Sequence, residues 1–146
     1  MAATRTYDPG AHLLSFLGIP LTAFGPDTFI AAARAEDGFM MTVGAGGEVA
    51  RSRNRNRTGR VTITLLQSSP ENDLLMQAAL TDEATGEGIG ALFLRDRKGT
   101  SVLHAENAWI AKIPDMSRAK QVGTCEWAID CADLEMFNGG NVASGL

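Results

Sequence analysis

The chain has 146 residues, of which 45% are hydrophobic and 21% charged, and its formal net charge is −4. This length suits one ordinary domain, and the hydrophobic share excludes an intrinsically disordered chain. No run approaches the ~18 apolar residues of a membrane span, and no basic start with an apolar stretch marks a signal peptide. We therefore expect one domain, residues 1–146, that is made in a cytoplasm and does not insert into a membrane as a monomer. The mildly acidic balance argues against a general nucleic-acid binder.

Short segments between glycine- and proline-rich turns predict a mainly β fold, either a sandwich or a barrel. Alternation of apolar and polar residues predicts strands over 28–33, 39–43, 60–65, 90–95, 101–113 and 124–132. The alternation is clearest in the last segment. Its apolar face holds Cys125, Trp127, Ile129 and Cys131, and its polar face holds Thr124, Glu126, Ala128 and Asp130. We expect Trp109 and Trp127 to anchor the core from neighbouring strands, with Trp109 on the same face as Leu103 and Ala105.

One segment predicts a helix, over about residues 70–81. Ser69 is a natural N-cap, Pro70 suits the first helical position, and Glu71 favours the positive end of the helix dipole. An apolar stripe at helical spacing follows, made of Leu74, Leu75, Ala78 and Ala79. The helix should cover the sheet and end between 81 and 86.

The most unusual segment is 51–60, which contains five of the 13 basic residues and leaves eight against 17 acidic residues elsewhere. In extended backbone, alternate positions project from one side. These positions are Arg51, Arg53, Arg55 and Arg57, and Arg60 follows them. We interpret residues 45–59 as a long hairpin loop that joins two paired strands, 39–43 and 60–65. A loop of that length is more often functional than accidental.

Three interpretations of this loop are open: nucleic-acid binding, a flexible solvated loop, and an arm that docks on an acidic surface of a neighbouring copy. No aromatic residue is interleaved for base stacking, which disfavours the first. The acidic remainder of the chain favours the third, because it supplies the complementary charge.

No constellation of residues indicates catalysis or metal binding. Glu126 and Asp130 stand ~13 Å apart along an extended strand, beyond the ~5–9.5 Å that separates glycosidase-type carboxylates. Two other interpretations of this carboxylate pair are open: a solvated face, or an acidic wall that subunits share in an assembly. His12 and His104, even with the cysteines, lack the spacing of zinc ligands. We expect no catalytic residues, no metal and no cofactor.

The two cysteines, Cys125 and Cys131, are six positions apart in a predicted strand. Their Cα atoms would then lie ~20 Å apart, whereas a disulfide needs less than ~7 Å. Free thiols or intermolecular disulfides are the remaining possibilities.

Three features in this order resemble a family of small tail-tube proteins from bacteriophages with contractile tails. The first is a strand, 39–44, that opens into a long polar loop and returns as the strand 59–66. The second is the helix signal at 68–75. The third is the pair of segments 108–114 and 122–127. The resemblance covers roughly residues 8–137, with N-terminal and C-terminal arms outside it.

The resemblance implies a structural virion protein with a fold similar to the secreted tube protein of type VI secretion systems. Such proteins form hexameric rings, in which each subunit gives strands to a continuous β-barrel around a channel. The rings stack into a tube inside a contractile sheath, and genomic DNA leaves through the lumen without being bound specifically. Further implied partners are the baseplate, tape-measure and tail-terminator proteins, and the implied location is the virion tail, assembled in the host cytoplasm.

The resemblance gives a candidate role to the acidic residues of the strand 124–132 and to the arginine-rich loop. An acidic wall repels the phosphate backbone and lets DNA slide, so the lumen candidates are Glu126 and Asp130, with Thr62 and Thr64 as neutral companions. The arginine loop should lie between stacked rings and pair with carboxylates of the next ring. The rival hypotheses are a β-barrel module that binds nucleic acid through Arg51–Arg60 and, less favoured, a small enzyme with a cupin-like barrel.

Overall fold

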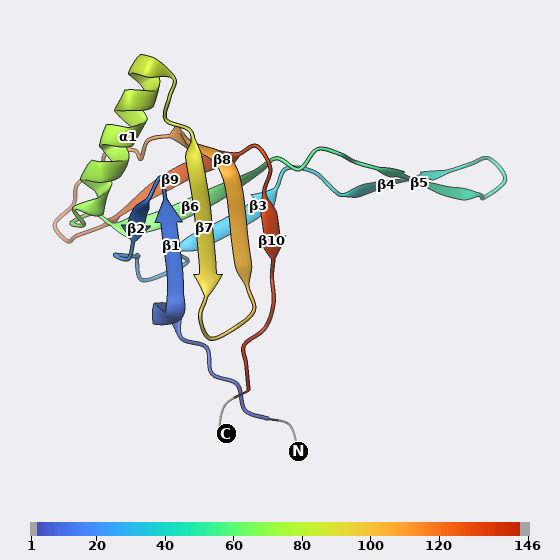
Figure 1. Ribbon diagram of the computed structural model, residues 1–146, viewed down its shortest axis with the longest axis horizontal. Helices are drawn as coiled ribbons and strands as arrows, with labels where there is room; N and C mark the ends of the chain where they lie inside the picture. The colour runs from blue at the N-terminus through green and yellow to red at the C-terminus, as the bar shows by residue number, and fades with distance from the viewer. Residues whose placement is uncertain (1–2, 144–146) are drawn as a thin grey trace.

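The computed structural model describes residues 3–143, and within that range the fold is mainly β with a single α-helix. Figure 1 shows a body of strands with the helix on one side and a long two-stranded hairpin that projects from the other. A short 3₁₀ turn at Pro9–Ala11 precedes the first strand. The elements are β1 (His12–Phe16), β2 (Ile19–Leu21), β3 (Ile30–Arg34), β4 (Phe39–Val43), β5 (Val49–Arg53), β6 (Gly59–Leu66), α1 (Glu71–Thr85), β7 (Gly90–Asp96), β8 (Val102–Lys112), β9 (Thr124–Cys131) and β10 (Glu135–Phe137).

The body is one antiparallel sheet in the order β2-β1-β7-β8-β9-β6-β3, with β10 added beside β8. Between residues 3 and 143 no pairing joins β2 to β3, so the sheet has open edges and is not closed into a barrel, one of the two architectures that the sequence suggested. The mainly β class with one helix is confirmed. Every predicted strand is present, whereas β1, β2, β5 and β10 were not predicted.

The core is a cluster of buried side chains to which strands from both halves of the sheet contribute. Phe16 of β1, Leu92 of β7, Ile63 of β6 and Ile129 of β9 are fully buried in it. Trp127 is 1% exposed and belongs to the same cluster, as predicted. The alternation of β6 and β9 therefore turns one face of these strands inward and leaves the other face accessible.

The helix begins where the sequence indicated. The Ser69 hydroxyl accepts a hydrogen bond from the Glu71 amide, and Pro70 already has helical backbone angles. Gly86 ends the helix in the left-handed conformation at φ 72°. Leu75 and Ala79 are buried against the sheet, so α1 covers it as expected and continues to Thr85.

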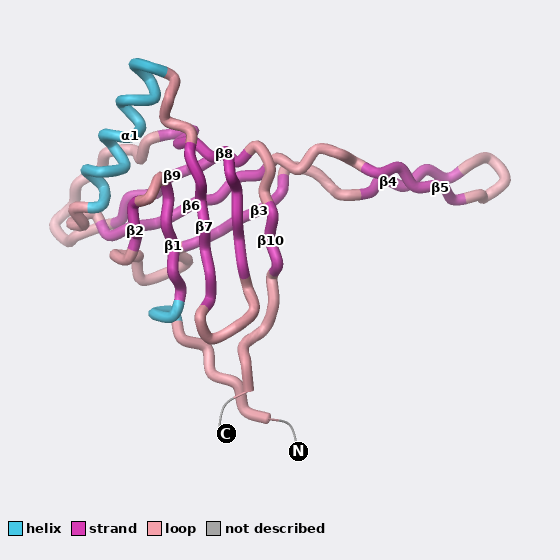
Figure 2. Tube along the Cα trace, viewed as in Figure 1, coloured by secondary structure: helices cyan, strands magenta, loops and turns pink. Residues whose placement is uncertain are grey.

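The prediction that residues 45–59 form a long loop between two paired strands, 39–43 and 60–65, is wrong. β4 pairs with β5, within the segment that was interpreted as loop, and the two form a separate two-stranded sheet. β6 pairs instead with β3 and β9. Figure 2 shows the resulting hairpin as strand on both sides of a short turn. A strand pattern is present in residues 49–53, Val49-Ala50-Arg51-Ser52-Arg53, because large and small side chains alternate there. Arginines stand at the positions where apolar residues are expected, so the search for apolar alternation did not find this strand.

The prediction for Trp109 is also wrong. Ala105 of β8 is paired with Leu92, and Ala108 with Gly90, so three steps along β8 match two along β7. This β-bulge reverses the alternation of β8 beyond it. Ala108 is therefore buried, and Trp109 lies beside Asp130 on the opposite face of the sheet, half-buried and outside the core cluster.

Candidate functional site: a polar sheet face and an arginine arm

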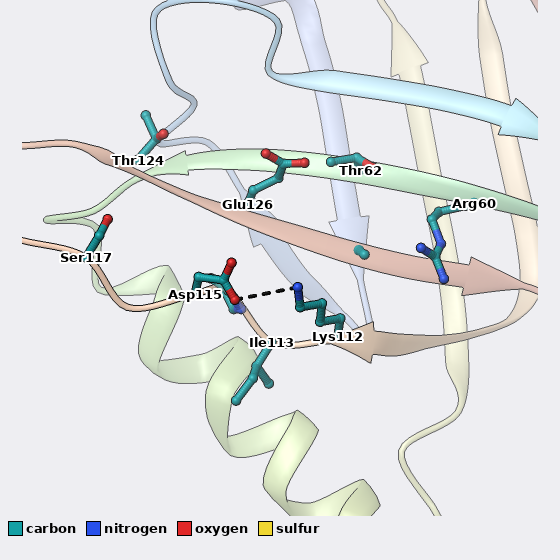
Figure 3. Close-up of a pocket in the computed structure, with 10 residues that line it drawn as sticks. Arg60, Thr62, Lys112, Ile113, Asp115, Ser117, Thr124 and Glu126 are labelled. Carbon is teal, nitrogen blue, oxygen red and sulfur yellow. Dashed lines mark ion pairs between the residues drawn. The ribbon is translucent and has the colours of Figure 1, made fainter.

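The outer face of β6 and β9, called here the β6–β9 face, contains all four predicted lumen residues. Cross-strand register places Thr64 opposite Glu126, Thr62 opposite Ala128, and Arg60 opposite Asp130. Because residues directly opposite each other in an antiparallel pair share a face, these side chains form one surface. Figure 3 shows Thr62, Arg60 and Glu126 on neighbouring strands above the loop that follows β8.

One of the two acidic residues on this face is paired with an arginine. Arg60 Nε lies 2.7 Å from Asp130 Oδ1 and donates a hydrogen bond to it. This hydrogen bond and the attraction of the carboxylate raise the pKa of Arg60 above its ordinary value. Glu126 forms no ion pair with any residue from 3 to 143. The face therefore carries one uncompensated negative charge beside two threonines.

A hollow of about 400 Å³ lies against this face, between β6, β9 and the residues that follow β8. Lys112 and Asp115 border it as an exposed ion pair, with 3.5 Å between Nζ and Oδ1. Over the described range 3–143, no three His, Cys, Asp or Glu side chains are grouped so as to hold a metal. His12 contacts Tyr7 and Phe29, and His104 contacts Phe93, so the two histidines serve separate aromatic contacts.

The hairpin of β4, β5 and the turn 44–48 is called here the arm, and it holds the first two predicted loop arginines. The guanidinium of Arg51 lies 4.3 Å, and that of Arg53 5.3 Å, from the ring centroid of Phe39. These cation–π contacts hold both charges on one face of the arm.

The remaining arginines of the set lie nearer the body. Arg55 is exposed in the connection 54–58 between the arm and β6. Arg57 lies 3.5 Å from Asp133 and 3.9 Å from Glu135, in a pair of exposed ion contacts. Arg60 belongs to the β6–β9 face, so the structure joins one predicted loop arginine to one predicted lumen carboxylate.

The two cysteines are free and differ in accessibility. Cys131 is 1% exposed, and burial together with the nearby Asp130 charge raises the pKa of its thiol to about 11. Cys125 is partly buried and packs against the core cluster. A thiol that is buried and protonated is a poor nucleophile, so Cys125 is the more accessible candidate for an intermolecular disulfide.

The residues that sequence reasoning missed are the apolar ones of the arm. Met41 is 72% exposed and Val49 66% exposed, although both lie in strands. The signal that could have revealed them is the alternation in 49–53, matched to that in 39–43. Among residues 3–143, no helix has the length and apolar character needed to span a membrane.

Known proteins resemble this chain in both sequence and fold. Residues 23–139 match the family described as Bacteriophage PhiTE tail tube protein. Structural protein ORF10 of Pseudomonas phage KPP10 is 30% identical in a match that covers 94% of this chain and 84% of that protein.

Solved structures of low sequence identity share the fold. A chain of the sheath–tube complex of PVC, an extracellular contractile injection system in its extended state, has a TM-score of 0.62 at 8% identity, covering 90% of this chain and 91% of that chain. A chain of the PVC sheath/tube terminator has a TM-score of 0.63 at 10% identity, covering 94% and 100%. The tube-terminating cap of the anti-feeding prophage has a TM-score of 0.57 at 6% identity, covering 94% of both chains.

Proposed function

Because the chain belongs to the phage tail tube protein family, we propose that it forms hexameric rings that stack into the tube of a contractile tail and provide the channel for DNA ejection. The observation that carries this proposal is the family match over residues 23–139. That range includes α1, the arm and the β6–β9 face. The proposed role is structural, without catalysis or a cofactor.

The open edges of the sheet support ring formation. β2 and β3 are the terminal strands of the sheet order, and each leaves backbone groups on one side without a strand partner in residues 3–143. Such edges favour addition of another strand. A neighbouring subunit that supplies a strand at each edge would extend the sheet around a ring, which produces a barrel that one subunit does not contain.

The β6–β9 face is the surface that we propose lines the channel. Its threonine hydroxyls and the Arg60–Asp130 pair contribute no net charge, and Glu126 contributes one negative charge per subunit. A wall that is weakly acidic repels the phosphate backbone and lets DNA slide, whereas a basic wall would retain it. The paired Asp130 makes this wall less acidic than the sequence alone suggested.

The arginines at the arm and its base are the proposed contacts between stacked rings. Arg51, Arg53 and Arg55 are exposed and carry no acidic partner within residues 3–143. An exposed ion pair contributes only ~0–1 kcal/mol. Repetition around each ring would nevertheless allow such pairs to set register between rings. The proposed further partners are the sheath, baseplate, tape-measure and tail-terminator proteins, in a virion tail assembled in the host cytoplasm.

Electron microscopy of the purified, nuclease-treated protein over a concentration series tests this function. The proposal predicts rings or hollow tubes that grow with concentration in the absence of nucleic acid. Small monodisperse particles at every concentration would contradict it and would favour nucleic-acid binding through Arg51–Arg60. In that case, filter binding of DNA or RNA should be lost when these arginines are replaced.

A further inference from the structure

The arm has one largely apolar face, on which the guanidinium groups of Arg51 and Arg53 lie over the Phe39 ring and the other apolar side chains are exposed. Cross-strand register pairs Phe39 with Arg53, Met41 with Arg51, and Val43 with Val49, so these six side chains share a face. The apolar members of this face are between 43% and 72% exposed. The opposite face is smaller and more polar, and consists of Met40, Thr42, Ala50 and Ser52.

The base of the arm is fixed to the chain on either side of it. The Asn54 side chain donates to Glu36 Oε2 at 2.7 Å and to the Asp37 carbonyl at 3.0 Å, and the Asn54 amide donates to the Gly38 carbonyl. These bonds join the two stems of the arm to each other, and the arm points away from the body, as Figures 1 and 2 show. A two-stranded hairpin alone is marginally stable in water, so an arm with exposed apolar side chains is expected to gain stability by docking.

The outward surface of α1 has the complementary composition. Leu75 and Ala79 point into the core, whereas Leu74 and Leu80 are 46% and 52% exposed. The segment 71–87, which contains α1, has five acidic residues and no lysine or arginine.

Two of the five carboxylates are engaged within the subunit, Glu71 by the Thr22 and Ala23 amides and Asp82 by the Gly88 amide. The exposed acidic residues of this surface are Asp73, Glu83 and Glu87. The surface therefore combines exposed leucines with three exposed carboxylates, whereas on the arm exposed apolar residues lie beside Arg51 and Arg53.

The arm and α1 lie at opposite ends of the long axis of the molecule (Figure 1). An arm that reaches away from its own body cannot cover its own α1, but it can reach that of another copy. A contact between two different surfaces is heterologous and repeats from copy to copy, which generates a ring or an open stack.

We propose that the apolar face of the arm docks on the outward surface of α1 of a second copy of this chain. Leu74 and Leu80 of that copy would receive Phe39, Met41, Val43 and Val49, and its carboxylates would face Arg51 and Arg53. This inference rests on the proposed function, since it names the surface that receives the arm within the assembly.

Cysteine crosslinking between two differently labelled populations tests the contact. One population carries Met41→Cys and the other Leu80→Cys, both with Cys125→Ser to remove the more accessible native thiol. The matched control replaces Met41→Cys by Met40→Cys, because Met40 is 55% exposed on the opposite face of the same strand. Oxidised mixtures are separated on non-reducing gels, and assembly is examined in parallel by electron microscopy.

The expected yield of mixed dimer is about fivefold or more higher for the 41–80 pair than for the 40–80 pair, because adjacent strand residues point to opposite faces. Equal yields, or dimers of the Met41→Cys population alone, in material that forms tubes would overturn the arm–helix contact and leave the tube function standing. Absence of rings and tubes from the wild-type chain would count against the tube function itself.

Charge reversal provides a second measurement that needs no introduced cysteine. Arg51→Glu with Arg53→Glu should weaken assembly, and Asp73→Lys with Glu83→Lys in the same chain should restore it at least in part. Lack of rescue, with all variants folded by circular dichroism, would contradict the proposed docking.

Discussion

Asn72 connects the helix to the sheet, and its replacement should destabilise the subunit measurably. Its amide oxygen accepts a hydrogen bond from Trp127 Nε1 at 2.9 Å, and its amide nitrogen donates to the carbonyls of Leu66 and Ser69. Trp127 is only 1% exposed, so in Asn72→Ala its indole N–H would have neither a protein partner nor free access to water.

The expected loss follows from these contacts. A buried donor left without a partner costs ~1–3 kcal/mol, and each lost hydrogen bond to a carbonyl removes ~0.5–1.5 kcal/mol. The better helix propensity of alanine returns about 0.5 kcal/mol. We therefore expect Asn72→Ala to lower the free energy of unfolding by ~1.5–5.5 kcal/mol. Urea unfolding followed by far-ultraviolet circular dichroism, below the assembly concentration, measures this quantity.

A double-mutant cycle with Trp127→Phe isolates the hydrogen bond. Phenylalanine has no N–H to leave unpaired, so Asn72→Ala should cost ~1 kcal/mol less in that background. Gln77→Ala, an exposed change in the same helix, is the matched control and should stay within ~0.5 kcal/mol of the wild type. A loss below ~0.5 kcal/mol for Asn72→Ala, or strict additivity in the cycle, would mean that the Asn72–Trp127 hydrogen bond does not stabilise the subunit.

Four further predictions concern the sheet, the thiols and the arginines. A Cβ at Gly59 would lie 2.7 Å from the Ala33 carbonyl oxygen, so Gly59→Ala should lower stability by ~1–3 kcal/mol in the same urea assay. Maleimide at pH 8 should label Cys125 far faster than Cys131 in peptide maps. Because the folded-state pKa of Cys131 is raised from 9.0 to about 11, the unfolded thiol ionises first, and stability should fall as pH rises across that interval. Replacing the four arginines in 51–57 by serine should leave the subunit folded but should weaken tube growth and the dependence of that growth on salt. Equal growth with unchanged salt dependence would reject the proposed arginine contacts between stacked rings.

The sequence predicted elements whose signals are local. The alternation in 124–131 depends on neighbouring residues, and so does the Ser69 hydroxyl that accepts from the Glu71 amide at the start of α1; the structure has both features. The face that joins Thr62, Thr64, Glu126 and Asp130 also follows from alternation, once β6 and β9 are known to pair.

What could not be predicted depends on partners distant in sequence. The bulge that moves Trp109 out of the core arises from the match between β7 and β8, and no single residue of β8 signals it. β4 pairs with β5 and not with β6. The sequence did not predict this pairing, because the arginines of β5 made that segment look like a loop. The Arg60–Asp130 ion pair joins residues that are 70 positions apart, so the sequence assigned them to separate sites.

A cryo-electron microscopy reconstruction of tubes grown from nuclease-treated protein would show which face of the sheet lines the channel. We expect stacked rings whose channel is lined by the β6–β9 face, with Glu126 and Thr62 directed into the lumen. A tube with this face turned outward, or a channel lined by other strands, would overturn the proposed lumen.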